Sequence, residues 1–185
     1  MKALKIKEIL EINTISKFYA VQGWVRTFRA NRFIALNDGS TIDNLQCVID
    51  FESINESLLK QINTGAALRL EGTLVESQGG GQKVELQVEK VILLGASDPE
   101  RYPIQPKKHS LEFLREKAHL RVRTSTFSAV MRVRSALSFA VHEFFQQKGF
   151  FHIHTPIVTG SDAEGAGEMF RVCLLYTSDA ADDLF

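Results

Sequence analysis

The apolar positions of the chain follow two different periods, and the change from one to the other falls near residue 95. In the first part, short runs alternate between apolar and polar residues, which is the pattern of β-strands with one buried face. One stretch among them, about residues 54–62, has helical spacing, with Ser53 at its expected start and Asn63–Gly65 at its end. The five alternating runs are Tyr19–Arg26, Arg32–Leu36, Gln46–Asp50, Ala67–Val75 and Lys83–Leu94.

This order of elements predicts a particular barrel. Three strands, a helix and two strands joined by a hairpin at Gln78–Gly81 are the order of the oligonucleotide-binding (OB) fold, a five-stranded, partly open β-barrel. We therefore assign residues 1–97 to an OB-fold domain, with an amphipathic helix near its N-terminus. In the second strand, Ile34 and Leu36 are the better inward pair, which leaves Phe33 on the outside. The alternative is that Phe33 belongs to the core.

A linker and a helical region follow. Pro99, Pro103 and Pro106 fall close together, and proline continues neither a helix nor a central strand, so residues 98–110 are predicted to be a linker. Beyond it, a short helix is expected over 111–120 and a long one over Ser125–Gln147, stopped by Gly149. The long helix is so apolar that a sheet or a partner subunit must cover it. A strand is expected next, over 150–156. The chain as a whole is thus predicted to be α+β.

Composition and charge narrow the function only slightly. The 185 residues carry a formal net charge of zero, but residues 101–134 hold nine Lys and Arg against two Glu. That local excess fits either a polyanionic partner or an ordinary solvated helical face, and charge alone does not separate the two. No apolar run reaches the length of a membrane span, so no membrane partner is expected. The two cysteines lie far apart without ligand spacing, which favours a reducing, cytoplasmic location over a disulfide scaffold.

Metal and phosphate motifs are missing from the sequence pattern. His152 and His154 alternate on one predicted strand but lack Cys or carboxylate partners at ligand spacing, so we expect no metal site. The glycines at 79–81 indicate a hairpin turn, because no Lys-Ser/Thr pair follows them as a phosphate-binding loop requires.

Three segments after the linker resemble a known family. Lys148–Val158, which follows the long helix and contains Pro156, is similar to the first signature motif of the class II aminoacyl-tRNA synthetases. By spacing alone, an ordinary helix–strand unit ended by a proline is the more frequent explanation, and the surrounding segments are what favour the family. Gly160–Phe170 and Leu114–Thr124 resemble a substrate loop and the start of the catalytic domain in the asparaginyl and aspartyl members, the latter segment closer to the asparaginyl type. The resemblance implies that residues 111–172 begin a class II catalytic domain, an antiparallel sheet with a long helix.

The same resemblance assigns roles to individual residues of the catalytic region. It implies that Glu164 accepts hydrogen bonds from the substrate α-ammonium group, and that Pro156 lies at a homodimer interface. The later motifs that hold ATP and Mg²⁺ are not in the sequence, so we expect no catalytic residue in these 185 residues and no cofactor bound to them. ATP, Mg²⁺ and asparagine are expected as ligands of a full-length parent enzyme only.

The barrel also resembles this family, in its anticodon-binding domain. The matching segments are Gly23–Arg29, Arg32–Gly39 and Leu45–Phe51. The resemblance implies that Phe33 stacks on the central anticodon uracil, that Gln46 reads the edge of that base, and that Arg29 helps to hold the loop. It further implies that Glu85 contacts the first anticodon base. Stacking on aromatic rings and amide contacts to base edges are how single-stranded RNA is commonly bound.

These resemblances imply an asparagine–tRNA ligase type of activity for the parent, with the asparagine tRNA as partner. Two other hypotheses stay open at this point. One is an aspartyl enzyme, with or without discrimination between the two tRNAs. The other is a free-standing OB module that binds single-stranded nucleic acid without catalysis, although such a module has no use for a long apolar helix.

The last residues have a different character. From Cys173 onward, the sequence CLLYTSDAADD resembles the in-frame translation of a transposase-type sequencing adapter. The likeness to the synthetases breaks off at Val172. We therefore expect residues 173–185 to be a sequencing artefact and residues 1–172 to be an N-terminal fragment; a divergent natural tail is the alternative.

Overall fold

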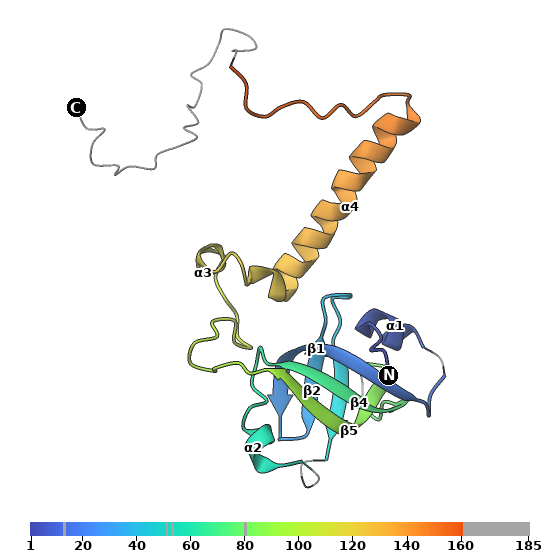
Figure 1. The fold of residues 1–185 in the computed structure, drawn as a ribbon, viewed down its shortest axis with the longest axis vertical. Coiled ribbons are helices and arrows are strands. Elements are labelled where there is room, and N and C mark those ends of the chain that lie inside the picture. The colour runs from blue at the N-terminus through green and yellow to red at the C-terminus, as the bar shows by residue number, and fades with distance from the viewer. Residues whose placement is uncertain (13, 51, 53, 80, 161–185) are drawn as a thin grey trace, which may run out of the picture. The chain divides into compact units, whose positions relative to one another are not determined.

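The structure is a computed structural model that describes residues 1–12, 14–50, 52, 54–79 and 81–160. It divides into two compact units, residues 1–137 and residues 138–185. The first contains a β-barrel and the segments that follow it, and the second begins within the long helix (Figure 1).

Five strands form a closed barrel in the order β1-β2-β3-β5-β4 (Figure 1). All neighbours are antiparallel except β3 and β5, which run parallel. The five-stranded OB-type barrel predicted from the sequence is confirmed, but it is closed rather than partly open, because β4 pairs with β1 along one edge and with β5 along the other. The strands are β1 (Phe18–Arg29), β2 (Phe33–Asn37), β3 (Leu45–Ile49), β4 (Ala67–Glu76) and β5 (Val84–Gly95).

The barrel core is built by the inward residues of each strand. In β2, Ile34 and Leu36 are fully buried whereas Phe33 is only partly covered, as the alternation predicted. Helix α1 (Ile6–Glu11) adds Ile6 and Ile9 to the same apolar cluster. The other buried members of that cluster are Val21, Val25, Leu45, Cys47, Ile49, Ile62, Ala66, Leu68, Leu70, Leu74, Val84, Leu86 and Val88.

One close approach inside the barrel demands glycine. At Gly72, where the pairing of β4 and β5 shifts register, a Cβ atom would overlap the backbone of Gln87. The absence of a side chain lets the two strands keep their spacing as they bend around the barrel.

The helix between β3 and β4 is shorter than expected. Helix α2 covers only Glu56–Leu59, and its N-cap is Asn55, whose side-chain oxygen accepts a hydrogen bond from the Ser57 amide at 2.8 Å. The expected cap, Ser53, lies outside the described residues. Leu59 packs against the barrel core and Ile62 is buried just beyond the helix. The apolar spacing that suggested a longer helix therefore reflects residues that anchor the turn to the barrel.

The segment after the barrel is irregular up to helix α3 (Leu111–Glu116), which is capped by Ser110. The expected helix over 111–120 ends early because Lys117 leaves the helical conformation, and a 3-10 turn at Arg121–Arg123 follows. Just before the predicted linker, the Ser97 hydroxyl donates to the Thr64 carbonyl at 2.9 Å, and Ile104 within the linker is buried.

Helix α4 spans Ser125–Gln147, as the apolar spacing predicted, and Gly149 with its positive φ follows the helix end. The Thr124 hydroxyl accepts from the Phe127 amide at the helix start. None of the residues of α4 is buried.

The strand expected over 150–156 is not formed, which corrects that prediction. A strand requires hydrogen bonds to a neighbouring strand, and none of the described residues pairs with residues 150–160. For the same reason the antiparallel sheet expected beside the long helix is not seen in the described part of the chain.

Candidate nucleic-acid interface on the barrel

Strand register places the four residues expected to read an anticodon on one surface of the barrel. Arg29 of β1 lies directly opposite Phe33 of β2, and Phe33 lies opposite Val48 of β3. One row along, Ala35 lies opposite Gln46. The parallel pairing of Cys47 with Leu86 sets Gln46 beside Glu85 of β5. We call the outward side of β1, β2, β3 and β5 formed by Arg29, Phe33, Ala35, Gln46, Val48, Glu85 and Gln87 the outer face.

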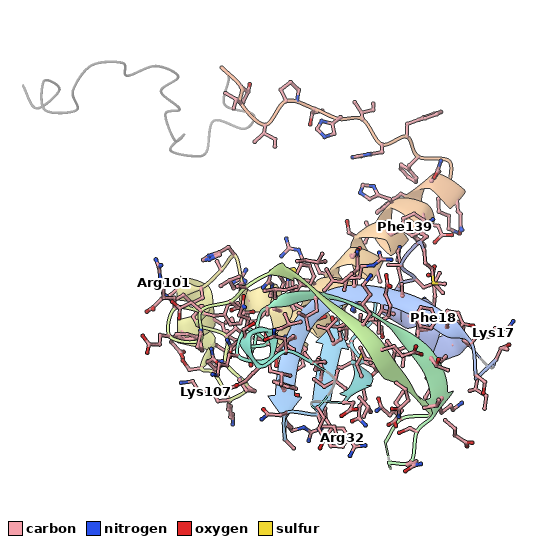
Figure 2. All side chains as sticks on the ribbon, turned by 60° about the horizontal axis from the view of Figure 1, so that its bottom comes forward. Lys17, Phe18, Arg32, Arg101, Lys107 and Phe139 are labelled. Carbon is pink, nitrogen blue, oxygen red and sulfur yellow. The ribbon has the colours of Figure 1, made fainter. Side chains whose placement is uncertain are left out.

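A β-bulge at Arg26 gives Arg29 its place on this face. Val25 points into the core, so uninterrupted alternation would turn Thr27 and Arg29 inward as well. The register shift between Val25 and Thr27 reverses the alternation, and Arg29 becomes exposed and paired with Phe33. Figure 2 shows Arg32, in the β1–β2 turn, at the lower edge of the barrel in that view, away from Lys17 and Phe18 at the right. The bulge thus places Arg29 beside Phe33, in addition to Arg32 of the turn.

Phe33 has the surroundings of a stacking platform. Its side chain is partly exposed, and the guanidinium carbon of Arg32 lies 5.8 Å from the ring centroid. Val48, its neighbour on β3, is almost fully buried, although it does not belong to the barrel's core cluster. An aromatic ring held beside arginines suits a nucleotide of single-stranded RNA. The base stacks on the ring, and the guanidinium groups attract the backbone phosphates.

Gln46 and Glu85 belong to a polar cluster on the same face. The Gln46 amide nitrogen donates to Glu85 Oε2 at 3.0 Å, and the Ser77 hydroxyl donates to the same oxygen at 3.1 Å. The Gln87 amide nitrogen donates to Glu85 Oε1 at 3.1 Å. Glu85 is the only polar residue among the buried residues that the structure describes, at 6% exposure. Gln46 is half-buried and Gln87 is exposed, so both amides remain accessible from the outer face.

A pocket of about 480 Å³ opens next to this cluster. It lies between the connection of β2 to β3, at Asp43 and Asn44, and the β4–β5 hairpin, at Gly79 and Gly81, with Gln46 in its wall. Its size falls within the range of small-molecule sites, so a single base has room there.

The sequence did not single out Ser77 or Gln87. Both contact Glu85, but Ser77 comes from the β4 side of the hairpin and Gln87 from β5. Alternation along β5 does put Gln87 on the same side as Glu85. What the sequence could not supply is the parallel register that brings β3 beside β5.

A second pocket, of about 630 Å³, lies between the barrel and the segment after it, both within residues 1–137. There the Arg123 guanidinium lies 4.6 Å from the ring centre of Trp24 and also contacts Tyr102. Burial lowers the pKa of Arg26 below its usual value; nearby Tyr102 acts against this and Arg123 adds to it. Arg121 covers Phe127 in a similar way. Two of the nine basic residues of 101–134 thus pack on aromatic rings, which favours neither explanation of that charge excess over the other.

The other residues that the sequence singled out are not among those that define the outer face. Pro156 is exposed and lies in an irregular segment, and Glu164 and residues 173–185 lie outside the described residues. Cys47 is a free thiol in the barrel core, where burial raises its pKa. Among the residues that the structure describes, no three His, Cys, Asp or Glu side chains are grouped to hold a metal ion. No helix in that part of the chain is long and apolar enough to cross a membrane.

Comparisons with known proteins match two parts of the chain to two different families. Residues 19–94 match the family of OB-fold nucleic acid binding domains, and residues 110–181 match the class II tRNA synthetases of the D, K and N group. The second match extends beyond Val172, where the sequence suggested that the likeness breaks off. The nature of residues 173–185 therefore stays a prediction, as do the domain boundaries.

Two curated relatives illustrate the similarity. The chain is 54% identical over 180 residues to an asparagine–tRNA ligase of Cytophaga hutchinsonii, covering 95% of this chain and 39% of the relative. It is 50% identical over 186 residues to that of Parabacteroides distasonis, covering 99% of this chain and 40% of the relative. The chain thus spans about two fifths of the length of the relatives it matches.

A solved structure shows a similar fold at lower identity. The asparaginyl-tRNA synthetase of Pyrococcus horikoshii complexed with asparaginyl-adenylate matches 94% of this chain with a TM-score of 0.79 and 23% identity, and 41% of that chain is covered. A putative aspartyl-tRNA synthetase of Leishmania major matches 84% of this chain with a TM-score of 0.70 and 21% identity, and 34% of it is covered. At these identities the likeness establishes the fold alone.

Proposed function

We propose that the chain belongs to the class II tRNA synthetases of the D, K and N group, and that it contributes the anticodon-binding part of an asparagine–tRNA ligase. The choice of asparagine rests on relatives of that name at 54% and 50% identity across nearly the whole chain. That choice disfavours the aspartyl alternative. The match of residues 110–181 to the synthetase family disfavours a free-standing OB module.

The observation that carries the proposal is the outer face. Arg29, Phe33 and Gln46 come from three different strands and meet on one surface only through a bulge and the barrel register. On this proposal, Phe33 stacks on the central uracil of the anticodon and Gln46 offers a donor and an acceptor to its edge. Arg29 attracts the phosphates of the loop.

The remaining parts of the proposal concern the longer enzyme. It would join asparagine to its tRNA through an asparaginyl-adenylate made from ATP with Mg²⁺, as a homodimer in the cytoplasm. Glu164 would hold the asparagine α-ammonium group and Pro156 would lie at the dimer interface. We expect the 185-residue chain alone to show no asparagine-dependent exchange between ATP and pyrophosphate.

The proposal predicts that substitutions on the outer face impair the transfer of asparagine to the tRNA but not the activation of asparagine by ATP. In an intact enzyme containing this barrel, Phe33→Ala and Gln46→Ala should each weaken aminoacylation of the tRNA by about 1–3 kcal/mol in transition-state binding, because a stacking or edge contact is lost. Asparagine-dependent ATP–pyrophosphate exchange, which needs no anticodon, should stay within about twofold of wild type.

Phe18→Ala is the matched control. Phe18, labelled in Figure 2, is an exposed aromatic residue at the start of β1, whereas Arg29 is the last residue of that strand. It should leave both assays unchanged. An equal loss of activation and aminoacylation in the Phe33 and Gln46 variants would mean that these residues hold the fold, and the proposed anticodon site would be wrong.

A further inference from the structure

Three hydrogen-bond donors converge on one carboxylate on the outer face. Glu85 accepts from the amide nitrogens of Gln46 and Gln87 and from the hydroxyl of Ser77. Ser77 is itself oriented, because its oxygen accepts from the Gly79 amide at 3.3 Å and leaves its proton for Glu85. With both oxygens engaged and 6% of the residue exposed, Glu85 is poorly placed to meet a base directly.

The chemistry of a carboxylate fixes how the two glutamines are turned. A glutamine side chain ends in an oxygen and a nitrogen of nearly equal size, and a half-turn exchanges acceptor for donors. An ionised carboxylate only accepts, so the nitrogen side of each amide must face Glu85. A half-turn of either amide would bring two acceptors together. The carbonyl oxygens of Gln46 and Gln87 are therefore directed away from Glu85.

We infer that Glu85 is a positioning residue that fixes the hydrogen-bond polarity of Gln46 and Gln87 and thereby makes the outer face select uracil over cytosine. The inference rests on the proposed anticodon-binding function. A carbonyl oxygen held in place accepts from the ring N3–H of uracil, whereas cytosine has an acceptor at that ring nitrogen. Glu85 acts through the two amides, which differs from the direct contact with the first anticodon base that the family resemblance implied.

The test compares two RNAs that differ at one base. The 185-residue chain is titrated at one fixed salt concentration with an RNA stem-loop carrying the asparagine anticodon GUU, and with the same stem-loop carrying cytosine at the central position. The wild-type chain should prefer uracil by about tenfold or more, as expected for one well-placed edge contact. Glu85→Gln should reduce the preference to less than about threefold, because an amide can donate as well as accept and frees its neighbours to turn.

Two further variants make the result specific. Glu89→Gln is the matched control: Glu89 faces outward on the same strand and undergoes the same change of charge, but its contact is with Thr73 and not with the glutamines. It should keep the wild-type preference. Glu85→Asp keeps the charge but withdraws the carboxylate by one methylene, so it should also lower the preference. Circular dichroism checks that each variant is folded. If the Glu85→Gln variant does not fold, the Glu85→Asp variant tests the inference in its place.

The outcomes distinguish a failure of the inference from a failure of the proposed anticodon-binding function. A wild-type chain that binds both RNAs equally overturns the proposed base reading and the inference with it. A wild-type preference that persists in Glu85→Gln and Glu85→Asp overturns the inference alone. The inference alone is also overturned if these variants lose affinity for both RNAs equally, because a purely structural or charge role predicts an unchanged ratio.

Discussion

The barrel and the long helix differ in what covers their apolar residues. In the barrel, strands and α1 bury a shared cluster, and Leu36 is 0% exposed. In α4, no residue is buried: Leu137 is 61% exposed and Phe139, labelled in Figure 2, is 70% exposed. Both regions are rich in apolar side chains. Only the barrel supplies, within the described residues, the surface that those side chains need.

This difference indicates that the barrel can fold independently, whereas α4 cannot. Removing apolar area from water is the main stabilising contribution to folding, and isolated helices gain little from their backbone hydrogen bonds alone. The barrel therefore has a source of stability that does not involve α4. The helix should depend on contacts from elsewhere, such as a second copy of the chain or further parts of a synthetase domain.

Matched leucines provide the largest expected contrast. Leu36→Ala should lower the free energy of unfolding of the barrel by about 2–5 kcal/mol, because it leaves a cavity in a closed core. Leu137→Ala should change it by less than about 0.5 kcal/mol. Both changes can be measured by urea unfolding followed by the fluorescence of Trp24. Trp24 is the single tryptophan of the chain and lies on β1. Comparable losses in the two variants would show that the helix contributes to the stability of the barrel.

The same contrast explains what could be predicted from the sequence. Alternation located the five strands and named Ile34 and Leu36 as inward, because a residue's side of a strand is a local property. Helix α4 was located by its spacing for the same reason. The strand expected at 150–156 failed because pairing is not local, and no partner strand is present among the described residues.

The outer face was only partly predictable. The family resemblance named Phe33, Gln46, Glu85 and Arg29, and the register brings them together. Whether they read an anticodon stays a prediction. Nothing in the local pattern marks the bulge at Arg26, although it turns Arg29 outward, and nothing in it shows that Gln87 shares a carboxylate with Gln46.

The next largest expected effect is that of substitutions in α4 on the self-association of the chain. The exposed apolar side of α4 includes positions spaced three or four residues apart, and such patches promote association. They are Val130, Val133, Leu137, Val141 and Phe144. We expect the 185-residue chain to dimerise or aggregate at micromolar concentration. Leu137→Glu combined with Phe144→Glu should weaken this by about a hundredfold, since each introduces a charge into the apolar contact.

The control places the same charges elsewhere on the helix. Ser135→Glu combined with His142→Glu alters two polar positions with the same seven-residue spacing, turned away from Leu137. Sedimentation velocity should show that this variant associates like the wild type. A wild-type chain that remains monomeric at tens of micromolar would contradict the assignment of this face to an interface.

The smallest expected effect comes from removing one helix cap in each region. Asn55 caps α2 through the Ser57 amide, and Thr124 caps α4 through the Phe127 amide. Asn55→Ala should lower the free energy of unfolding of the barrel by about 1 kcal/mol. The reason is that α2 belongs to the barrel: Leu59 packs on its core, so freeing the helix end weakens the whole unit.

Thr124→Ala removes a similar hydrogen bond but should leave the urea midpoint reported by Trp24 almost unchanged. Its effect should appear instead as faster hydrogen exchange in the first turn of α4, because a helix without buried residues opens separately from the barrel. Equal shifts of the Trp24 midpoint in both variants would mean that α4 and the barrel unfold as one unit, and the contrast between the two regions would then be wrong.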